Sequence, residues 1–302
     1  MNHKRLVVID SNSVIHRAFH ALPSLTTKEG ELVNAVYGFL LVFFKALKEF
    51  RPDYVAAVFD FPAPTFRHEK YKEYKAQRPS TPEQLCRQIP KIKEILRAFG
   101  VPIFEKQGFE ADDLIGALVR AAEKKQAFPR LEIIILTGDT DLLQLVNPQT
   151  RVYILKKGAK DTILYDENLV GEKYLGLKPE QLLDLRALKG DPSDNIPGVR
   201  GVGEKTAIGL IKEYGNLENI YHNLPLIPGR VREKLILHKQ DAFFSRELAK
   251  IDQNAPIDFN LEKCRWGNYK QAKIQKVLEE LEFRSLIKKL PEIGCQGGLK
   301  AS

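Results

Sequence analysis

The chain has 302 residues, of which 43% are hydrophobic and 28% are charged. This composition is ordinary for a globular protein and excludes a disordered tail, and the length allows one large domain or two closely joined ones. The longest apolar runs, such as Phe39–Phe44, fall well short of the roughly 18 residues of a membrane span, so we expect no membrane partner. The net charge of +8 suggests a polyanionic partner, although many basic proteins simply have basic surfaces.

The N-terminus and the cysteines indicate a compartment. Met1–Arg5 leads directly into the strand-like run Leu6–Ile9, so we expect no signal peptide. Cys86, Cys264 and Cys295 are few, odd in number and without metal-ligand spacing. They fit unpaired thiols in a reducing environment. We therefore expect a cytoplasmic protein.

Three short apolar runs end at or just before acids. Leu6–Asp10 and Tyr54–Asp60 each close on an aspartate, and Leu131–Leu136 is followed by T-G-D-T-D, which contains Asp139 and Asp141. Such continuous runs are typical of strands buried on both faces of a parallel sheet. Because helix-like segments separate them, we expect an α/β protein with a mostly parallel central sheet flanked by helices. Ligands of such sheets bind beyond the carboxyl ends of the strands.

The stretch G-F-E-A-D-D-L places Glu110, Asp112 and Asp113 at the start of an expected helix over Asp112–Glu123. Helix capping explains one acid at this position but not three. By itself the stretch leaves an acid-rich helix start and a metal site equally open. Acids gathered at one sheet edge raise each other's pKa unless a cation neutralises them, and hard cations such as Mg²⁺ or Mn²⁺ prefer carboxylate oxygens. With the strand-end acids included, the sequence favours a metal site.

A basic and aromatic segment, Phe66–Arg78, follows the second expected strand. We expect it to be helical, to end at Pro79–Pro82, and to be followed by a second helix over Glu83–Phe99. Its cations and aromatic rings fit a solvated helix face, but they fit a nucleic-acid contact better, through phosphate neutralisation and base stacking. The residues in question are Phe66, Arg67, Lys70, Tyr71, Lys72, Tyr74, Lys75 and Arg78.

Further acids and glycines lie downstream of an expected helix over Lys178–Leu188. G-D-P-S-D supplies Asp191 and Asp194 at i and i+3, and I-P-G-V-R-G-V-G-E-K-T leads into a helix over Ala207–Tyr214. The glycines permit a tight hairpin whose backbone N–H groups can meet a phosphate. The stretch fits neither a dinucleotide fingerprint nor a P-loop. The hairpin residues are Gly198, Gly201, Gly203, Lys205 and Thr206.

Five blocks of sequence resemble the 5′-nuclease family, which comprises the 5′-3′ exonuclease domain of bacterial DNA polymerase I, its stand-alone relatives and the flap endonucleases. The blocks are F-D-F-P-A-P-T-F-R, Y-K-A-Q-R, G-F-E-A-D-D-L, T-G-D-T-D-L-L-Q-L and G-D-P-S-D-N-I-P-G-V-R-G-V-G-E-K-T-A. The resemblance implies a PIN-like core over residues 1–178 with a helical arch at about 64–100. It also implies a helix-hairpin-helix and helical DNA-binding region over residues 179–290, and we expect a disordered tail over 291–302.

The resemblance also implies site residues. One divalent ion, Mg²⁺ or Mn²⁺, would be held by Asp10, Asp60, Glu110 and Asp112, with Asp113 close to it through water. A second ion would be served by Asp139, Asp141, Asp191 and Asp194. Lys75 and Arg78 match residues that contact the scissile phosphate, and Arg17 matches a phosphate-binding position. Further DNA contacts would come from Arg67, Lys70, Lys72 and Tyr74. The hairpin would hold the duplex and, as in relatives, a monovalent cation such as K⁺.

The function implied is a structure-selective 5′-3′ exonuclease and 5′-flap endonuclease that leaves 5′-phosphate and 3′-hydroxyl ends. Its partners would be DNA with 5′ flaps, 5′ ends or RNA/DNA primer junctions, in replication and repair. We expect a monomer that is either a stand-alone enzyme or part of a DNA polymerase. Two alternatives are a related metal-dependent ribonuclease, which would lack the arch and hairpin, and a non-catalytic branched-DNA binder, which should have lost acids. His16 and Phe61–Pro64 depart from the residues expected there, which could alter the grip on the 5′ end.

Overall fold

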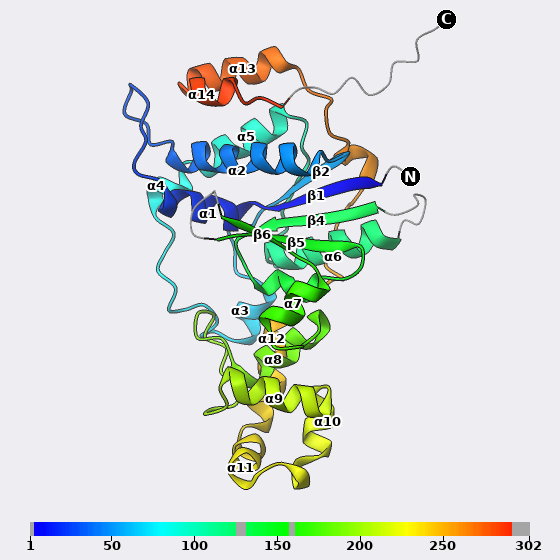
Figure 1. Ribbon diagram of the computed structural model, residues 1–302. Helices are drawn as coiled ribbons and strands as arrows, with labels where there is room; N and C mark the ends of the chain where they lie inside the picture. Colours follow the sequence, from blue (N-terminus) through cyan, green and yellow to red (C-terminus); the bar gives the residue numbers. More distant parts are fainter. Residues whose placement is uncertain (1–2, 125–130, 157–160, 292–302) are drawn as a thin grey trace, which may run out of the picture.

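The structure is a computed structural model that describes residues 3–124, 131–156 and 161–291 (Figure 1). The predicted tail beyond residue 291, and Cys295 within it, lie outside the described residues. A six-stranded sheet has the order β3-β2-β1-β4-β5-β6. All neighbouring strands are parallel except β5 and β6, which pair antiparallel. The strands are β1 Lys4–Asp10, β2 Tyr54–Val58, β3 Ile103–Phe104, β4 Leu131–Thr137, β5 Thr150–Leu155 and β6 Thr162–Tyr165.

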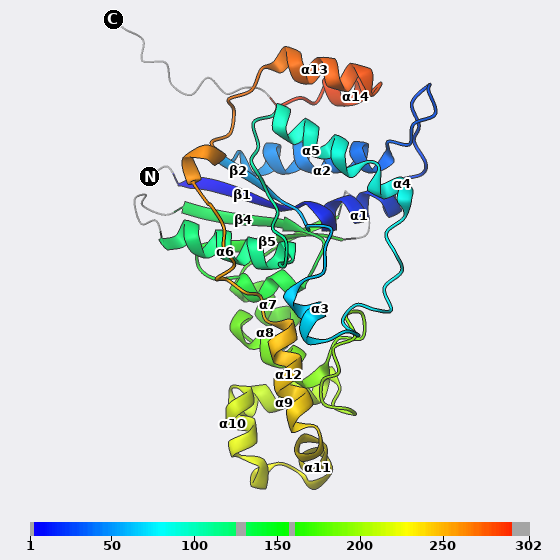
Figure 2. The same ribbon diagram turned by 180° about the vertical axis from the view of Figure 1, so that it is seen from behind.

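The sheet is covered on both faces, which explains its continuous apolar strands. In β1, Val7 and Ile9 contribute to one hydrophobic core, while Leu6 and Val8 contribute to the core on the opposite face. Helices α1 (Ser11–Ala21), α2 (Asn34–Phe50) and α5 (Ile89–Ala98) supply the first core, and α6 (Ala111–Lys124) supplies the second. Figures 1 and 2 show these layers from opposite sides. The predicted α/β architecture is therefore confirmed.

A helical region projects from the sheet layers as a narrow extension (Figures 1 and 2). Its main helices, α8 and α12, pack against each other, and α9 packs against α8. The chain then returns to the core, where α13 and α14 lie outside α5 and α2. These helices are α7 Glu167–Lys173, α8 Leu182–Lys189, α9 Glu204–Tyr214, α10 Leu217–His222, α11 Gly229–Leu237, α12 Lys239–Ala249, α13 Gln271–Glu280 and α14 Arg284–Ile287.

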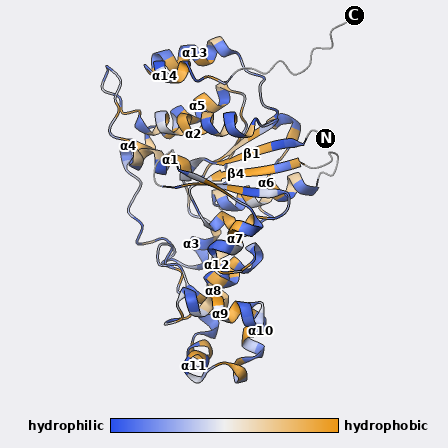
Figure 3. Ribbon diagram, in the orientation of Figure 1, coloured by the Kyte–Doolittle hydropathy of each residue, from blue (hydrophilic) through white to orange (hydrophobic). Residues whose placement is uncertain are grey.

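Hydropathy follows this arrangement. The central strands β1 and β4 are largely hydrophobic, whereas the helices combine both characters (Figure 3). Amphipathic helices of this kind bury one face and expose the other. Within the described residues, every helix is too short or too polar to traverse a lipid bilayer.

The prediction of one continuous helix over Phe66–Arg78 was wrong beyond Lys70. Helix α3 spans only Phe66–Lys70, and turns follow as far as residue 77. The backbone of Lys75 has φ 56°, a left-handed conformation that a helix cannot contain. Its N–H donates to the Asp194 carbonyl at 3.0 Å instead of to a helical partner. Tertiary contacts therefore override the local helical pattern here.

The helix predicted over Glu83–Phe99 is interrupted. Helix α4 covers Glu83–Cys86, and α5 begins at Ile89. Pro90 lacks an N–H and so cannot continue the hydrogen-bond ladder from α4. At the break, the Gln88 side chain accepts a hydrogen bond from the Ala35 N–H at 2.8 Å and so helps cap α2. Because Ile92, Ile95 and Leu96 are buried in the core, this part of the 64–100 segment is a sheet-covering layer.

Other local expectations need smaller changes. The segment that begins at Asp141 forms a 3₁₀ helix, η1, over Asp141–Leu145. A 3₁₀ turn, η2 at Pro179–Gln181, precedes α8. Two further 3₁₀ turns, η3 at Leu224–Leu226 and η4 at Leu261–Cys264, lie downstream. Strands β5 and β6 were not predicted.

Glycine at position 198 is required by close backbone packing. Gly198 has φ +62°, and a Cβ at this position would lie 2.2 Å from the Gly190 nitrogen. We expect Gly198→Ala to lower the free energy of unfolding by about 2–4 kcal/mol, from left-handed strain and overpacking together. Gly209→Ala is the matched control, because a Cβ there meets nothing within 4 Å and a helix-interior alanine should stabilise by about 0.5–1 kcal/mol. Denaturant unfolding measures both, and equal stability of the two variants would contradict the packing argument.

Candidate active site

Asp10 ends the central strand β1 and is only 4% exposed. Its carboxylate accepts hydrogen bonds from Thr137 Oγ1 at 2.6 Å and from the Ser13 N–H at 3.2 Å, so it also caps α1. Burial raises the pKa of Asp10 to about 7, although the Thr137 hydrogen bond lowers it; the nearby charge of Asp60 raises it further. The carboxylate is therefore costly to ionise here without a compensating cation.

Three further acids crowd the same edge. Asp60 follows β2 and accepts the Ala111 N–H at 2.8 Å, at the start of α6. Burial raises the pKa of Asp112 well above its usual value, and the charges of Asp139 and Asp10 add to the effect. Burial likewise raises the pKa values of Asp60 and Asp139. These groups repel one another, so their arrangement suits a bound cation.

A second group of acids comes from two different parts of the chain. Asp141 begins η1, and Asp191 and Asp194 lie on the turn after α8. Each offers a carboxylate oxygen, and these oxygens lie within 4.8 Å of one another. Arg186 forms ion pairs with Asp141 and, at 2.9 Å, with Asp191. Although burial raises the pKa of Asp191, hydrogen bonds from Ser193 and the Arg186 charge lower it more, so the net shift is downward.

Acids from both groups line one cleft of about 670 Å³. All the donors are carboxylate oxygens, which suit hard divalent cations better than soft ones. The raised pKa values in the first group and the close oxygens in the second show that the residues fit metal ions. The lining acids are Asp10, Asp60, Glu110, Asp112, Asp139, Asp141 and Asp194.

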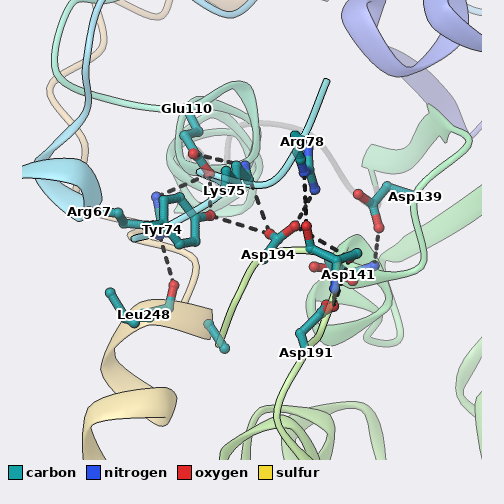
Figure 4. A network of polar contacts seen from close by, with 12 residues as sticks. Arg67, Tyr74, Lys75, Arg78, Glu110, Asp139, Asp141, Asp191, Asp194 and Leu248 are labelled. Carbon is teal, nitrogen blue, oxygen red and sulfur yellow. Dashed lines mark hydrogen bonds and ion pairs between the residues drawn. The ribbon is translucent and has the colours of Figure 1, made fainter. Parts of the chain in front are cut away.

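Two cations from the segment after α3 point into this cleft (Figure 4). Lys75 Nζ lies 2.8 Å from Glu110 Oε1 and 3.9 Å from Asp194 Oδ2, and Arg78 forms an ion pair with Asp194. Burial raises the pKa of Glu110, but the charges of Lys75 and Arg67 lower it more, so the net shift is downward. Lys75 and Arg78 thus face the predicted metal ligands directly.

Tyr74 does not lie where a base-stacking residue would. It is 3% exposed, and its hydroxyl donates to Glu110 at 3.1 Å and lies 3.4 Å from Asp194. Burial raises the pKa of this hydroxyl. The prediction that Tyr74 contacts DNA is therefore corrected, because the ring has almost no accessible face. It instead connects two of the acids.

Arg67 and Asp113 also require correction. Arg67 is 3% exposed and Asp113 is fully buried, and two parallel hydrogen bonds of 2.7 and 2.8 Å join them. A DNA phosphate cannot reach an arginine in this position, and the Asp113 oxygens already have protein partners. The prediction that Arg67 binds DNA, and that Asp113 serves an ion through water, does not agree with this structure.

The remaining basic residues are more accessible. Arg17 lines the cleft and donates to the carbonyls of Gly138 at 2.8 Å and Lys156 at 2.9 Å. Lys70 pairs with Glu247 at the surface, and Lys72 is exposed. These positions leave Arg17, Lys70 and Lys72 near enough to solvent for phosphate contacts.

The glycine hairpin lies at the start of α9, in the projecting helical region. Gly203, Lys205 and Thr206 are exposed there. The Gly198 N–H donates to Ser245 Oγ at 2.8 Å, so this N–H holds the hairpin rather than a ligand. The Gly201 carbonyl accepts from Lys234 at 2.8 Å.

Arg186 is the site residue that sequence reasoning missed. It lies on α8, lines the cleft, and bridges acids on two separate segments. The sequence shows a basic residue five positions before the first acid of G-D-P-S-D. This spacing does not single out Arg186 as a site residue, because basic residues are common on helices. Only the packing of α8 beside η1 gives it two carboxylate partners.

Comparison with known proteins shows which family the chain belongs to. Residues 5–175 match the family described as "5'-3' exonuclease, N-terminal resolvase-like domain". Residues 177–272 match "5'-3' exonuclease, C-terminal SAM fold". The chain therefore belongs to the 5′-3′ exonuclease family, and the resemblance noted in the sequence is confirmed.

Curated relatives include DNA polymerase I of Bacillus caldotenax, 42% identical over 288 residues that cover 95% of this chain and 32% of the relative. Another is the thermostable DNA polymerase I of Thermus thermophilus, 44% identical over 284 residues that cover 94% of this chain and 33% of the relative. The chain thus spans about a third of the length of these relatives.

Solved structures share the fold. A T5 5′-exonuclease with bound zinc has a TM-score of 0.69 at 21% identity, covering 94% of this chain and 98% of its own. The catalytic core of Rad2 in complex with a DNA substrate has a TM-score of 0.60 at 19% identity, covering 93% of this chain and 88% of its own. These similarities extend over both the sheet layers and the helical region.

Metal should stabilise the folded chain, because it neutralises acids that repel one another. We expect saturating Mn²⁺ or Mg²⁺ to add about 2.7 kcal/mol to the free energy of unfolding at one hundred times the dissociation constant. Asp194→Asn should reduce this gain. The control is Asp258→Asn, because the Asp258 side chain is 96% exposed. Thermal unfolding in metal and in EDTA measures the difference, and identical curves would contradict a metal site.

Proposed function

We propose that this chain is a divalent-metal-dependent 5′-3′ exodeoxyribonuclease and 5′-flap endonuclease that leaves 5′-phosphate and 3′-hydroxyl ends. The observation that carries this proposal is that acids from both groups line one cleft. Lys75 and Arg78 face these acids. An acidic cleft alone would repel a phosphodiester. Cations beside the acids give the substrate phosphate a place to bind.

The metal assignment follows the family resemblance, which places Asp139 with the second group of acids although its charge also acts on Asp112. Asp10, Asp60, Glu110 and Asp112 would hold one Mg²⁺ or Mn²⁺, and Asp139, Asp141, Asp191 and Asp194 would serve the other. When bound, such a pair of ions activates water and stabilises the charge on the reacting phosphate. The protein's part is to fix the carboxylates through hydrogen bonds. Thr137 does this for Asp10, and Ser193 does it for Asp191.

Lys75 and Arg78 would bind the scissile phosphate. In this structure their charges compensate Glu110 and Asp194. Once metal neutralises those acids, both cations are available to the phosphate with little change in position. The left-handed backbone at Lys75, φ 56°, supports this role, since strained residues cluster at functional sites.

The rest of the chain would hold the DNA. We assign nuclease chemistry to residues 1–178, with an arch within about 64–100, and duplex binding to residues 179–290. Arg17, Lys70 and Lys72 would contact the 5′ strand, and the hairpin with Gly203, Lys205 and Thr206 would hold the duplex backbone. A K⁺ ion at the hairpin belongs to this proposal. The substrates would be 5′ flaps, 5′ ends and RNA/DNA primer junctions.

The biological setting follows from the relatives, which are DNA polymerase I chains about three times as long. We propose that the chain acts as a monomer in the cytoplasm, in replication and repair, either beside a DNA polymerase or joined to one. The rival functions are a metal-dependent ribonuclease and a non-catalytic branched-DNA binder. The basic segment and hairpin argue against the first, and the complete set of nine acids argues against the second.

The deciding experiment is cleavage of a labelled 5′-flap duplex in Mg²⁺ or EDTA, beside a linear single strand of the same sequence. We expect metal-dependent cutting near the flap junction and little cutting of the single strand. Asp139→Asn should abolish cutting and leave flap binding intact, because it alters a metal ligand and not a phosphate contact. Binding without cutting by the unmodified chain, in both Mg²⁺ and Mn²⁺, would favour the branched-DNA binder.

Lys75→Ala should slow single-turnover cleavage by about 100-fold or more, a loss of roughly 3 kcal/mol of transition-state stabilisation. Flap affinity should fall far less, because other cations still contact the DNA. Lys263→Ala is the control, since the Lys263 side chain is 69% exposed and belongs to the 3₁₀ turn after α12. Equal losses in affinity and rate would make Lys75 a tether for DNA and not a catalytic residue.

A further inference from the structure

Arg67 lies on the short helix α3 and forms hydrogen bonds to several other segments of the chain. Two of its nitrogens bind the Asp113 carboxylate at 2.7 and 2.8 Å. The other hydrogen bonds go to the carbonyls of Leu248 at 2.8 Å and Lys250 at 2.7 Å (Figure 4 shows the first). Its guanidinium also lies 3.5 Å from Glu110 Oε2. One side chain thus joins α3, α6 and the end of α12.

Asp113 completes this junction from the other side. Besides Arg67, it accepts the backbone N–H of Glu110 at 3.2 Å and that of Asp252 at 2.8 Å. The first bond fixes the backbone of an acid that lines the cleft. The second holds the segment by which the helical region returns to the core. Asp113 therefore touches a cleft residue and the return segment at once.

The return segment, residues 248–252, is tightly docked. A Cβ on Gly116 of α6 would lie 2.6 Å from Ile251 Cγ2, so the segment packs directly on the helix backbone. The Gln144 side chain, which lines the cleft, lies 3.4 Å from both the Ala249 carbonyl and the Ile251 N–H. The position of the helical region is thus coupled to the acidic helix α6 at several points.

We propose that Arg67 and Asp113 act as one positioning unit. The unit fixes Glu110 and the base of the segment that carries Lys75, and it ties both to the helical region. This inference rests on the proposed function, and it gives both residues a role that neither phosphate binding nor metal ligation describes. Binding of duplex DNA to the helical region would thereby be linked to the placement of Glu110.

Single substitutions test this poorly, because each leaves a buried charge without its partner and destabilises the fold strongly. Replacing both partners by apolar residues of similar volume is often neutral for stability. The double variant Arg67→Met with Asp113→Leu is therefore the informative one. The control is Arg5→Met with Glu132→Leu, a more exposed ion pair in which Glu132 also contacts Arg151. That pair, 2.5 Å apart, joins β1 to β4 near their amino ends, at the opposite edge of the sheet from the acids.

We would make three measurements on each of five proteins: the unmodified chain, the double variant, its two single variants and the control. They are thermal unfolding, Mn²⁺ affinity by calorimetry without DNA, and single-turnover flap cleavage. The double variant should remain folded, bind Mn²⁺ about 10-fold more weakly and cleave about 100-fold more slowly, the usual cost of losing a residue that orients metal ligands. The control should keep both affinity and rate.

Comparing the two single variants with the double variant also tests whether Arg67 and Asp113 act together. Each folded single variant should lose as much cleavage as the double variant, because residues of one unit are non-additive. The slope of log affinity for DNA against log salt should not change, since Arg67 neutralises no phosphate.

Two results would overturn the proposal. Unchanged Mn²⁺ affinity and cleavage in the folded double variant would make the pair merely structural. The opposite result has two parts: the cleavage losses of the two single variants multiply in the double variant, and the slope of log DNA affinity against log salt falls by about one. It would mean that Asp113 serves the metal and Arg67 binds phosphate separately. If the unmodified chain cuts no DNA, the proposed function fails, but the Mn²⁺ measurement still tests the positioning unit.

Discussion

Electrostatic repulsion among carboxylates is the constraint on which this structure depends. Two unit charges about 5 Å apart near a protein surface repel by roughly 3 kcal/mol, and three mutually close carboxylates would lose about 10 kcal/mol, which is comparable to the whole stability of a typical domain. Asp141, Asp191 and Asp194 stand at such distances. The chain tolerates them because Arg186 and Arg78 supply positive charge at the same place. Divalent ions would replace part of that compensation.

The cleft exists only where three parts of the chain meet. Strand β1 lies between β2 and β4, so Asp10 comes close to the acids that follow its neighbours. The turn after α8 brings a second set of acids from the helical region. The segment after α3 then docks on that turn, with the Asn195 side chain donating to the Glu73 carbonyl at 2.9 Å. Moving any one part would separate acids from their cations.

The cations of the Phe66–Arg78 segment differ in how deeply they are buried. Lys75 retains 23% of its side-chain surface and Arg78 retains 48%, so both can exchange a carboxylate for a phosphate. Arg67 retains 3% and donates four hydrogen bonds within the protein. All three belong to one short stretch that looks uniformly suited to DNA in the sequence. The difference in accessibility is the reason why we propose substrate contact for the first two and positioning for the third.

The sequence alone determined the α/β class, the family, and the acids that gather at the sheet edge, because buried parallel strands and carboxylate spacing are local patterns. The sequence likewise located α6, which was expected over Asp112–Glu123. The tertiary structure decided the rest: the end of α3 at Lys70, the break before α5, the antiparallel strand β6, and the contacts of Tyr74, Arg67, Asp113 and Arg186. An ion pair between residues 46 positions apart leaves no local signal, since its partner is chosen by packing.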